Sequence, residues 1–381
     1  MKSLLFVLSV VFHVGQGGSI NAALDSARQV YNERQTPCVI EIAPGTYYEE
    51  LTIDIPHLTF RNAAKHPSIA LHKGGVEADR NAVRISWYYG HGYQYRSMGD
   101  TFNYGGKRMR CWNASVLVTA QDFTAENIIF ENSFNQYVSP AEMTDSLWDI
   151  SQTKNDWTVN ERPKRQMPQR PRVVFSTEVQ YKRYNERAAA ISFASTASGR
   201  LVNCRCVGHQ DVLYGDHGAA VDIEGGIIQG TVDFIFGGMD LTVRKTELVV
   251  GCNAEKKQCY IAAGRGYVPE TPLGARSSSP AIIGARSSSP ATGDSVATPY
   301  GNVPADELAR QGMVFDRCVV RYATKEEAVS PGQPLVYLAR PWRWWGRHVF
   351  VKTDTRKVRL HPDIFSLGLT KGKQAPFCSR E

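Results

Sequence analysis

Short apolar runs recur along most of the chain, separated by glycine, asparagine and aspartate. They include LTIDI, LTF, ASVLV, NIIF, GGIIQ, VDFIF and HVFV, and the longer stretches RLVNCRCV, LTVRKTELVV and MVFDRCVV. Runs of β-branched and aromatic residues between turn-forming residues are typical of β-strands. Because the runs do not alternate strictly and recur roughly every two dozen residues, they favour a solenoid over a sandwich. We therefore predict an all-β solenoid.

One segment near the start follows a helical pattern instead. The sequence SINAALDSARQVYN covers residues 19–32, and Ser19 is suited to the N-cap position. Its apolar residues fall on one face at helical spacing: Ile20, Ala23, Leu24, Ala27 and Val30. This pattern predicts a short N-terminal helix that caps the solenoid.

Two polar stretches interrupt the strand pattern. Residues 135–184 are rich in Gln, Arg, Pro and Trp, and residues 264–312 contain GARSSSPA twice, at 274–281 and 284–291. Such stretches are typical of long loop insertions, and the duplicated segment is typical of a low-complexity linker. We expect two loop insertions here, with disorder over 274–295.

The first 12 residues, MKSLLFVLSVVF, carry one lysine before an apolar run. The run has the length of a signal-peptide core and is too short to span a bilayer. It is equally compatible with a first, buried strand, because no cleavage motif of small residues follows. Secretion and a first strand therefore remain two interpretations, with residues 13–381 forming a single domain.

Composition describes a large folded protein with a basic surface. The chain has 381 residues, of which 42% are hydrophobic and 21% charged, so predominant disorder is excluded. Its net charge of +7 would attract an acidic polymer, either nucleic acid or an acidic polysaccharide. The eight cysteines are compatible with an oxidising compartment but too few for a disulfide scaffold.

Two aspartates stand in apolar surroundings where a carboxylate is costly. Asp211 lies in GHQDVLYG and Asp233 in GTVDFIFG, with 22 residues between their positions. If 22 residues make one coil, the two residues stack on strands about 4.8 Å apart. One pKa should then rise while the other group stays ionised, as a general acid beside a nucleophile requires. The alternative is that both are turn aspartates that bind local backbone amides.

Neighbouring residues add chemistry to this pair. Gln210 offers an amide donor for a developing oxyanion. In YLARPWRWWGR, Arg340 can hold a carboxylate and Trp342 offers a flat face for a sugar ring, although Arg and Trp also pair for structural reasons.

The cysteines and histidines suggest further sites only weakly. Cys204, Cys206, His209 and His217 match no common zinc spacing, so we expect no metal, and the two cysteines more often pack or form a disulfide. A local disulfide between Cys252 and Cys259 is compatible with their spacing.

The motifs resemble those of the pectin methylesterase family. GTVDFIFG at 230–237 is similar to the family signature and GHQDVLYG to its second motif. The likeness extends to PGTYYEE at 44–50, SVLVTAQDFTAENIIFENS at 115–133 and YLARPW at 337–342, in the family's order. The resemblance implies a right-handed parallel β-helix that hydrolyses galacturonate methyl esters in pectin.

The resemblance also implies roles for individual residues. Asp233 would be the nucleophile, Asp211 the general acid and base, and Gln210 an oxyanion donor. Arg340 would bind Asp233 and Trp342 would line the sugar subsite. No metal or organic cofactor, nucleic acid or membrane is implied. We expect a secreted monomer that acts on pectin, with any proteinaceous inhibitor unknown.

One departure from the family leaves a rival function open. Where the family has QAVAL, this chain has RAAAI at 187–191, so Arg187 replaces a glutamine that helps to bind the oxyanion. Its guanidinium could contact substrate or pair with an aspartate and lower activity. A catalytically weak pectin-binding relative is therefore the alternative. A glycosidase or a serine esterase is disfavoured, because neither adjacent aspartates nor a G-x-S-x-G motif occurs.

Overall fold

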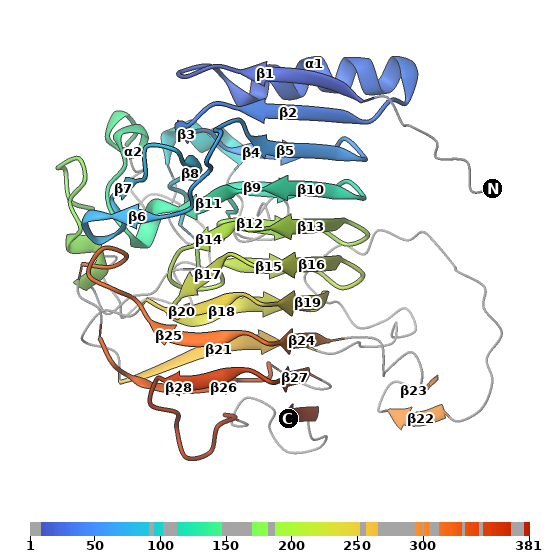
Figure 1. The fold of residues 1–381 in the computed structure, drawn as a ribbon, viewed down its shortest axis with the longest axis vertical. Coiled ribbons are helices and arrows are strands. Elements are labelled where there is room, and N and C mark those ends of the chain that lie inside the picture. Colours follow the sequence, from blue (N-terminus) through green and yellow to red (C-terminus); the bar gives the residue numbers. More distant parts are fainter. Residues whose placement is uncertain are drawn as a thin grey trace.

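The computed structural model describes most of the chain as a stack of parallel strands. The described residues are 9–90, 95–101, 113–146, 170–181, 187–251, 257–265, 295–298, 301–304, 312–329, 332–342, 346–366 and 377–381. Their strands form three long sheets, here called sheets A, B and C, that run the length of the molecule (Figure 1). The chain passes from A to B to C and then to the next strand of A, as a right-handed parallel β-helix does. The predicted solenoid is thereby confirmed.

The three sheets contain strands from coils that follow one another along the sequence. Sheet A consists of β1 (Val10–Val14), β2 (Cys38–Ile42), β5 (Leu58–Asn62), β10 (Phe123–Glu126), β13 (Ser198–Val202), β16 (Ala220–Glu224), β19 (Asp240–Arg244), β24 (Met313–Asp316), β27 (Arg347–Val351) and β29 (Phe377–Arg380). Sheet B consists of β3 (Gly45–Tyr48), β8 (Val83–Trp87), β11 (Ile128–Asn132), β14 (Arg205–Val207), β17 (Ile227–Gly230), β20 (Glu247–Val250), β25 (Val319–Tyr322) and β28 (Asp354–Lys357). Sheet C consists of β4 (Leu51–Ile53), β9 (Val116–Val118), β12 (Ile191–Phe193), β15 (Leu213–Gly215), β18 (Val232–Gly237), β21 (Gln258–Gly264) and β26 (Leu335–Ala339).

One residue in the left-handed conformation, or two in the coil with Gly225 and Gly226, turns the chain from sheet A to sheet B. The residues at this corner in six coils are Asn127, Asn203, Gly225, Lys245, Arg317 and Lys352, with φ between 47° and 68°. Asparagine and glycine adopt this conformation at little cost, and stacked Asn203 donates to Asn127 over 2.7 Å. The longer apolar runs such as RLVNCRCV are therefore two short strands joined at a corner.

Helix α1 (Ile20–Arg34) covers the N-terminal end of the stack (Figure 1). The Ser19 hydroxyl accepts a hydrogen bond from the Ala22 amide at 3.2 Å, as the N-cap prediction requires. Ile20, Leu24 and Ala27 are buried, so the predicted capping helix is confirmed. Its buried face covers the otherwise open end of the apolar interior.

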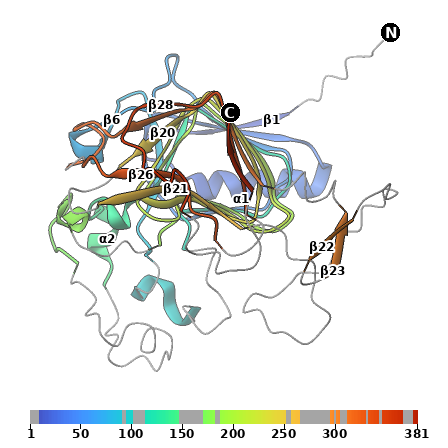
Figure 2. The same ribbon diagram turned by 90° about the horizontal axis from the view of Figure 1, so that it is seen from below.

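The three sheets enclose a central space (Figure 2). The hydrophobic core fills this space. Inward side chains of successive coils stack as buried aliphatic and aromatic residues, among them Ile40, Phe60, Phe130, Ile235 and Phe315. Cys204 and Cys206 are part of this core, as expected for small apolar residues. Cys252 lies outside the described residues, so its disulfide with Cys259 stays a prediction.

Smaller elements lie outside the three sheets. They are β6 (Leu71–His72), η1 (Lys73–Gly75), β7 (Glu77–Ala78), η2 (Arg96–Thr101), η3 (Ser133–Asn135), α2 (Pro140–Thr144), η5 (Glu178–Tyr181), β22 (Ser295–Thr298) and β23 (Gly301–Pro304). The described parts of the two predicted insertions contain α2, η5 and the β22–β23 hairpin. The duplicated segment 274–291 lies outside the described residues.

The start of the chain is described from residue 9. Strand β1 pairs in parallel with β2, so Val10–Val14 form the first strand of sheet A. Residues 1–8 lie outside the described residues, and the predicted signal segment therefore stays a prediction. Among the described helices, none has the length and apolar character to cross a bilayer.

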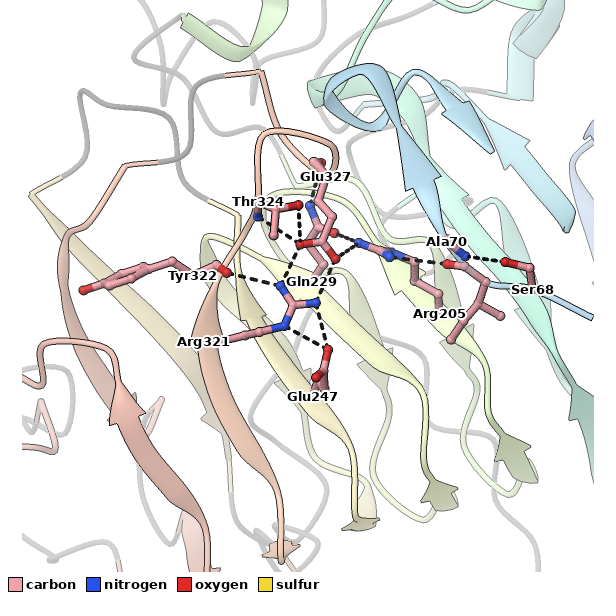
Figure 3. Close-up of polar contacts among 10 residues, drawn as sticks. Ser68, Ala70, Arg205, Gln229, Glu247, Arg321, Tyr322, Thr324 and Glu327 are labelled. Atoms are coloured by element: carbon pink, nitrogen blue, oxygen red, sulfur yellow. Dashed lines mark hydrogen bonds and ion pairs between the residues drawn. The ribbon is translucent and has the colours of Figure 1, made fainter. Parts of the chain in front are cut away.

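A buried ion-pair network holds the loop after β25 against sheet B (Figure 3). Glu327 in this loop accepts hydrogen bonds from Arg205 at 2.9 Å and from Arg321 at 2.6 and 2.8 Å. The Gln229 side chain donates to the Glu327 carbonyl at 3.0 Å, and Arg321 also donates to Glu247 at 2.9 Å. The network joins strands of four coils around Glu327, whose carboxylate binds the two arginines and whose carbonyl binds Gln229.

Candidate active site

Sheet C brings the two aspartates of the sequence motifs together. Gln210, directly before Asp211, bridges in parallel to Val232, directly before Asp233. The Asp211 amide donates to the Val232 carbonyl at 3.3 Å. The two aspartates therefore occupy equivalent positions in consecutive coils, and the one-coil spacing predicted from the sequence is confirmed.

Both aspartates have a left-handed backbone. Asp211 has φ 56° and Asp233 has φ 48°, a conformation that aspartate and asparagine tolerate better than most residues. The pairing of β18 with β21 shifts register between Val232 and Ile235, across Asp233. Such an irregularity redirects a side chain from the regular alternation of a strand. Here it accompanies two carboxyl groups that are buried next to each other.

Asp233 is bound by a fork of two hydrogen bonds from Arg340. The Arg340 Nε donates to Oδ1 of Asp233 at 3.0 Å, and Nη2 donates to Oδ2. Asp233 is buried, with 7% of its side chain exposed. Burial raises the pKa of Asp233 above its ordinary value, and the charge and hydrogen bonds of Arg340 reduce that rise without cancelling it. The fork thus favours the carboxylate form and fixes its orientation.

Asp211 is equally buried but is not bound by an arginine fork. Its side chain is 2% exposed, and its Oδ1 has no hydrogen-bond partner among the described residues. Burial, followed by the charge of Asp233, raises the pKa of Asp211 well above its ordinary value. Arg187, whose Nε lies 3.7 Å from Oδ2, and the hydrogen bond from Gln210 oppose this rise without cancelling it. Asp211 is therefore the member of the pair that holds a proton more readily.

Aromatic side chains line sheet C beside this pair. The rings of Tyr214 and Phe236 stack with centroids 5.7 Å apart, and Trp342 meets Phe236 edge to face at 5.4 Å. Tyr214 and Phe236 are cross-strand partners in β15 and β18. Half-buried Trp342 follows Arg340 by two residues, so the aromatic surface adjoins the arginine fork.

The structure brings the predicted site residues to one part of sheet C. Arg187 bridges to Gln210 in the next coil, so it lies one coil before Asp211, as the RAAAI alignment requires. Among the described residues, no group of three or more His, Cys, Asp or Glu could hold a metal ion. The sequence did not indicate Tyr260, whose ring lies under the Arg340 guanidinium. Tyr260 lies one coil after Asp233, but more residues separate β20 from β21 than separate β17 from β18, so the 22-residue spacing does not point to it.

Fold and site together define a parallel β-helix protein with a pair of buried carboxyl groups in consecutive coils. No known family profile matches the chain. In sequence it is 21% identical, over 82% of its own length, to the probable pectinesterase/pectinesterase inhibitor 23 of Arabidopsis thaliana. The chain spans only 41% of that protein.

Solved structures with a similar fold include pectin methylesterases. The enzyme from Aspergillus niger gives a TM-score of 0.54 at 18% identity, covering 97% of this chain and 83% of the enzyme. PemA of Erwinia chrysanthemi gives 0.52 at 17% identity, covering 97% and 92%, and the carrot enzyme gives 0.50 at 15%, covering 93% and 76%. The chain therefore has the fold of pectin methylesterases, as its motifs predicted.

Proposed function

We propose that this protein is a carboxylic ester hydrolase of the pectin methylesterase type. It would hydrolyse galacturonate methyl esters in pectin and release methanol and acidic pectin. The observation that carries this proposal is the asymmetry of the buried pair: burial raises the pKa of both carboxyls, but only Asp233 is bound by the Arg340 fork, and the pKa of Asp211 lies well above its ordinary value. A nucleophile must be ionised and a general acid protonated, and the arginine fork favours the ionised form of Asp233 over that of Asp211.

The reaction would proceed through an acyl-enzyme. A carboxylate oxygen of Asp233 attacks the ester carbonyl carbon, and the Gln210 amide donates to the oxyanion that forms. As the intermediate collapses, the bond to methoxide breaks and the Asp211 proton passes to the leaving oxygen, which departs as methanol. Asp211, now ionised, takes a proton from water, and the resulting hydroxide attacks the acyl group. Hydrolysis returns the Asp233 carboxylate and the protonated Asp211.

Arg187 and Trp342 would contact the substrate in this proposal. Trp342, beside Phe236, offers an apolar ring surface for a galacturonate unit. The Arg187 guanidinium lies close enough to the pair to stabilise negative charge that develops during ester attack. Water and the chain's own residues carry every proton in these steps, so the proposal requires no cofactor.

The substrate also gives the proposal a cellular setting. Pectin is a polymer of the extracellular wall, so we propose that the protein is secreted and acts on pectin as a monomer. Nucleic acid and membranes have no part in this proposal.

One contact favours a second function, that of a catalytically weak or inactive pectin-binding protein. Arg187 approaches the Asp211 carboxyl to 3.7 Å, and its charge lowers the pKa of Asp211 against the larger effect of burial. If this pairing kept Asp211 ionised, the leaving methoxide would lack its proton donor. Pectin binding would then persist without turnover.

The proposal is tested by methanol release from highly methylated pectin. We expect Asp233→Asn and Asp211→Asn each to lower turnover at least about a hundredfold, with pectin binding nearly intact, because both act mainly in the transition state. Asparagine also tolerates the left-handed backbone at both positions. Asp222→Asn is the matched control, because Asp222 is exposed on β16. Equal turnover by all four proteins would contradict the assignment of the pair.

A further inference from the structure

Arg340 reaches Asp233 across an intervening strand. Arg340 directly follows β26, Asp233 lies in β18, and β21 lies between these two strands in sheet C. Two strand spacings correspond to about 10 Å. The long Arg340 side chain must therefore cross the level of β21 before its guanidinium meets the carboxylate.

Tyr260 lies where this crossing takes place. It is the β21 residue that pairs with Val232 in β18 and with Tyr337 in β26. The Arg340 Cζ lies 3.9 Å from the centroid of the Tyr260 ring. At this distance, and with only 20% of the Arg340 side chain exposed, the ring attracts the cation through its quadrupole.

The Tyr260 ring is itself fixed by stacking. The Tyr337 ring lies nearly parallel to it, with centroids 5.0 Å apart and planes at 7°, and His361 stacks on Tyr337 at 4.1 Å. The Tyr260 hydroxyl donates to the Gln258 side chain at 2.9 Å. Three stacked rings from successive coils thus form a rigid column under the guanidinium.

We propose that Tyr260 is a positioning residue, which holds the Arg340 guanidinium in the orientation that forks onto Asp233. This inference rests on the proposed role of Asp233 as nucleophile. A flat aromatic face restricts a guanidinium to few orientations, whereas an aliphatic residue would leave the long side chain more rotamers. Without the ring, Arg340 would bind Asp233 for only part of the time.

Activity gives the first test. We expect Tyr260→Leu to lower kcat/KM about fivefold, which corresponds to about 1 kcal/mol. The acid limb of the pH profile of kcat/KM should move to higher pH in this variant. When Arg340 binds Asp233 less firmly, it opposes the effect of burial less, so the pKa of Asp233 rises further. Tyr260→Phe keeps the ring and should retain both values. Tyr322→Leu is the control, because half-buried Tyr322 lies in sheet B, where its hydroxyl donates to Pro334.

A second measurement does not depend on activity. In protein labelled with ¹⁵N-arginine, the Arg340 Nε–H signal can be assigned by its loss in Arg340→Lys. The Tyr260 ring current should shift this signal upfield, and the fork should slow its exchange with water. Both effects should persist in Tyr260→Phe and disappear in Tyr260→Leu. If the leucine variant does not fold, Tyr260→Met takes its place in the experiment.

The two measurements separate the two hypotheses. If wild-type protein releases no methanol, the proposed function fails, while the arginine signal still decides the role of Tyr260. An Arg340 signal and exchange rate that are the same in wild type and Tyr260→Leu would overturn the positioning role, whatever the activity. A shifted acid limb in Tyr322→Leu equal to that in Tyr260→Leu would also overturn it.

Discussion

At the scale of single residues, the chemistry depends on how strongly each member of the carboxylate pair holds its proton. The two aspartates share burial and backbone conformation, so these properties do not distinguish them. The arginine beside each carboxyl group distinguishes the two. Arg340 binds Asp233 through two hydrogen bonds, whereas Arg187 approaches Asp211 only at 3.7 Å and remains 35% exposed. Solvent screens the second contact more than the first.

Replacing Arg187 separates the esterase from the weak binder. We expect Arg187→Gln to leave methanol release unchanged or reduced, because an arginine that stabilises the developing oxyanion is at least as effective as the amide. Arg200→Gln, at an exposed surface pair with Glu224, is the control. A gain of tenfold or more, about 1.4 kcal/mol of barrier, would instead show that Arg187 suppresses catalysis.

The protonation of Asp211 should also appear in the stability of the protein. A carboxyl whose folded pKa is raised binds more protons in the folded state, so its contribution to stability falls as pH rises above the ordinary value. Asp211→Asn removes this titration. We therefore expect the variant to gain thermal stability relative to wild type as pH rises from about 4 to about 8. Thermal unfolding at several pH values measures the difference, and a constant difference would contradict a raised pKa.

At the scale of elements, the loop after β25 joins coils that are distant in sequence. Glu327 accepts from Arg205 and Arg321, and the neighbouring Glu326 carbonyl accepts from the Gly75 amide at 2.8 Å. A Cβ at Gly75 would lie 2.9 Å from the Glu327 carbonyl oxygen, so the close contact requires glycine there. The loop therefore fixes the outer face of sheet B, on a different side of the coil from the carboxylate pair.

Removing the Glu327 charge should weaken the fold. Burial raises its pKa, but Arg321 and Arg205 outweigh burial and bring the pKa of Glu327 to about 2. Glu327→Gln leaves buried Arg205 without its carboxylate, and we expect a loss of about 3 kcal/mol in unfolding free energy at neutral pH. Denaturant titration measures this loss.

The control for this experiment is a surface carboxylate. Glu224→Gln removes the partner of exposed Arg200 and should cost about 0.5 kcal/mol or less. In wild type, the Glu327 contribution should be lost as pH falls from about 4.5 toward 2. Equal losses in the two variants would show that the network contributes no more than a surface pair.

At the scale of the whole molecule, net charge bears on substrate binding. The charge of +7 should attract polygalacturonate over distances that salt screens. We expect affinity for de-esterified polygalacturonate to fall steeply between about 0.01 and about 0.1 M salt. Fully methylated pectin, which lacks the charge, is the control ligand. Binding of polygalacturonate that does not change with salt would show that the excess charge plays no part.

The sequence by itself determined the repeating strands, the capping helix and the stacking of Asp211 on Asp233. These features depend on local composition and on spacing within one coil, both of which can be read along the chain. The 22-residue interval sufficed because no insertion separates β15 from β18. For the same reason, the position of Arg187 one coil earlier could be predicted.

Only the tertiary structure decided which residues meet across longer intervals. Tyr260 lies under Arg340, and Glu327 meets Arg205, although loops of different lengths separate them in sequence. Loop length changes the spacing of residues along the chain without changing the strand register that brings them together. The corners within RLVNCRCV and similar runs could not be predicted from the sequence either, because one left-handed residue hardly changes the pattern of apolar positions. Contacts within a coil follow from the sequence, whereas contacts across insertions follow from the register of the folded sheets.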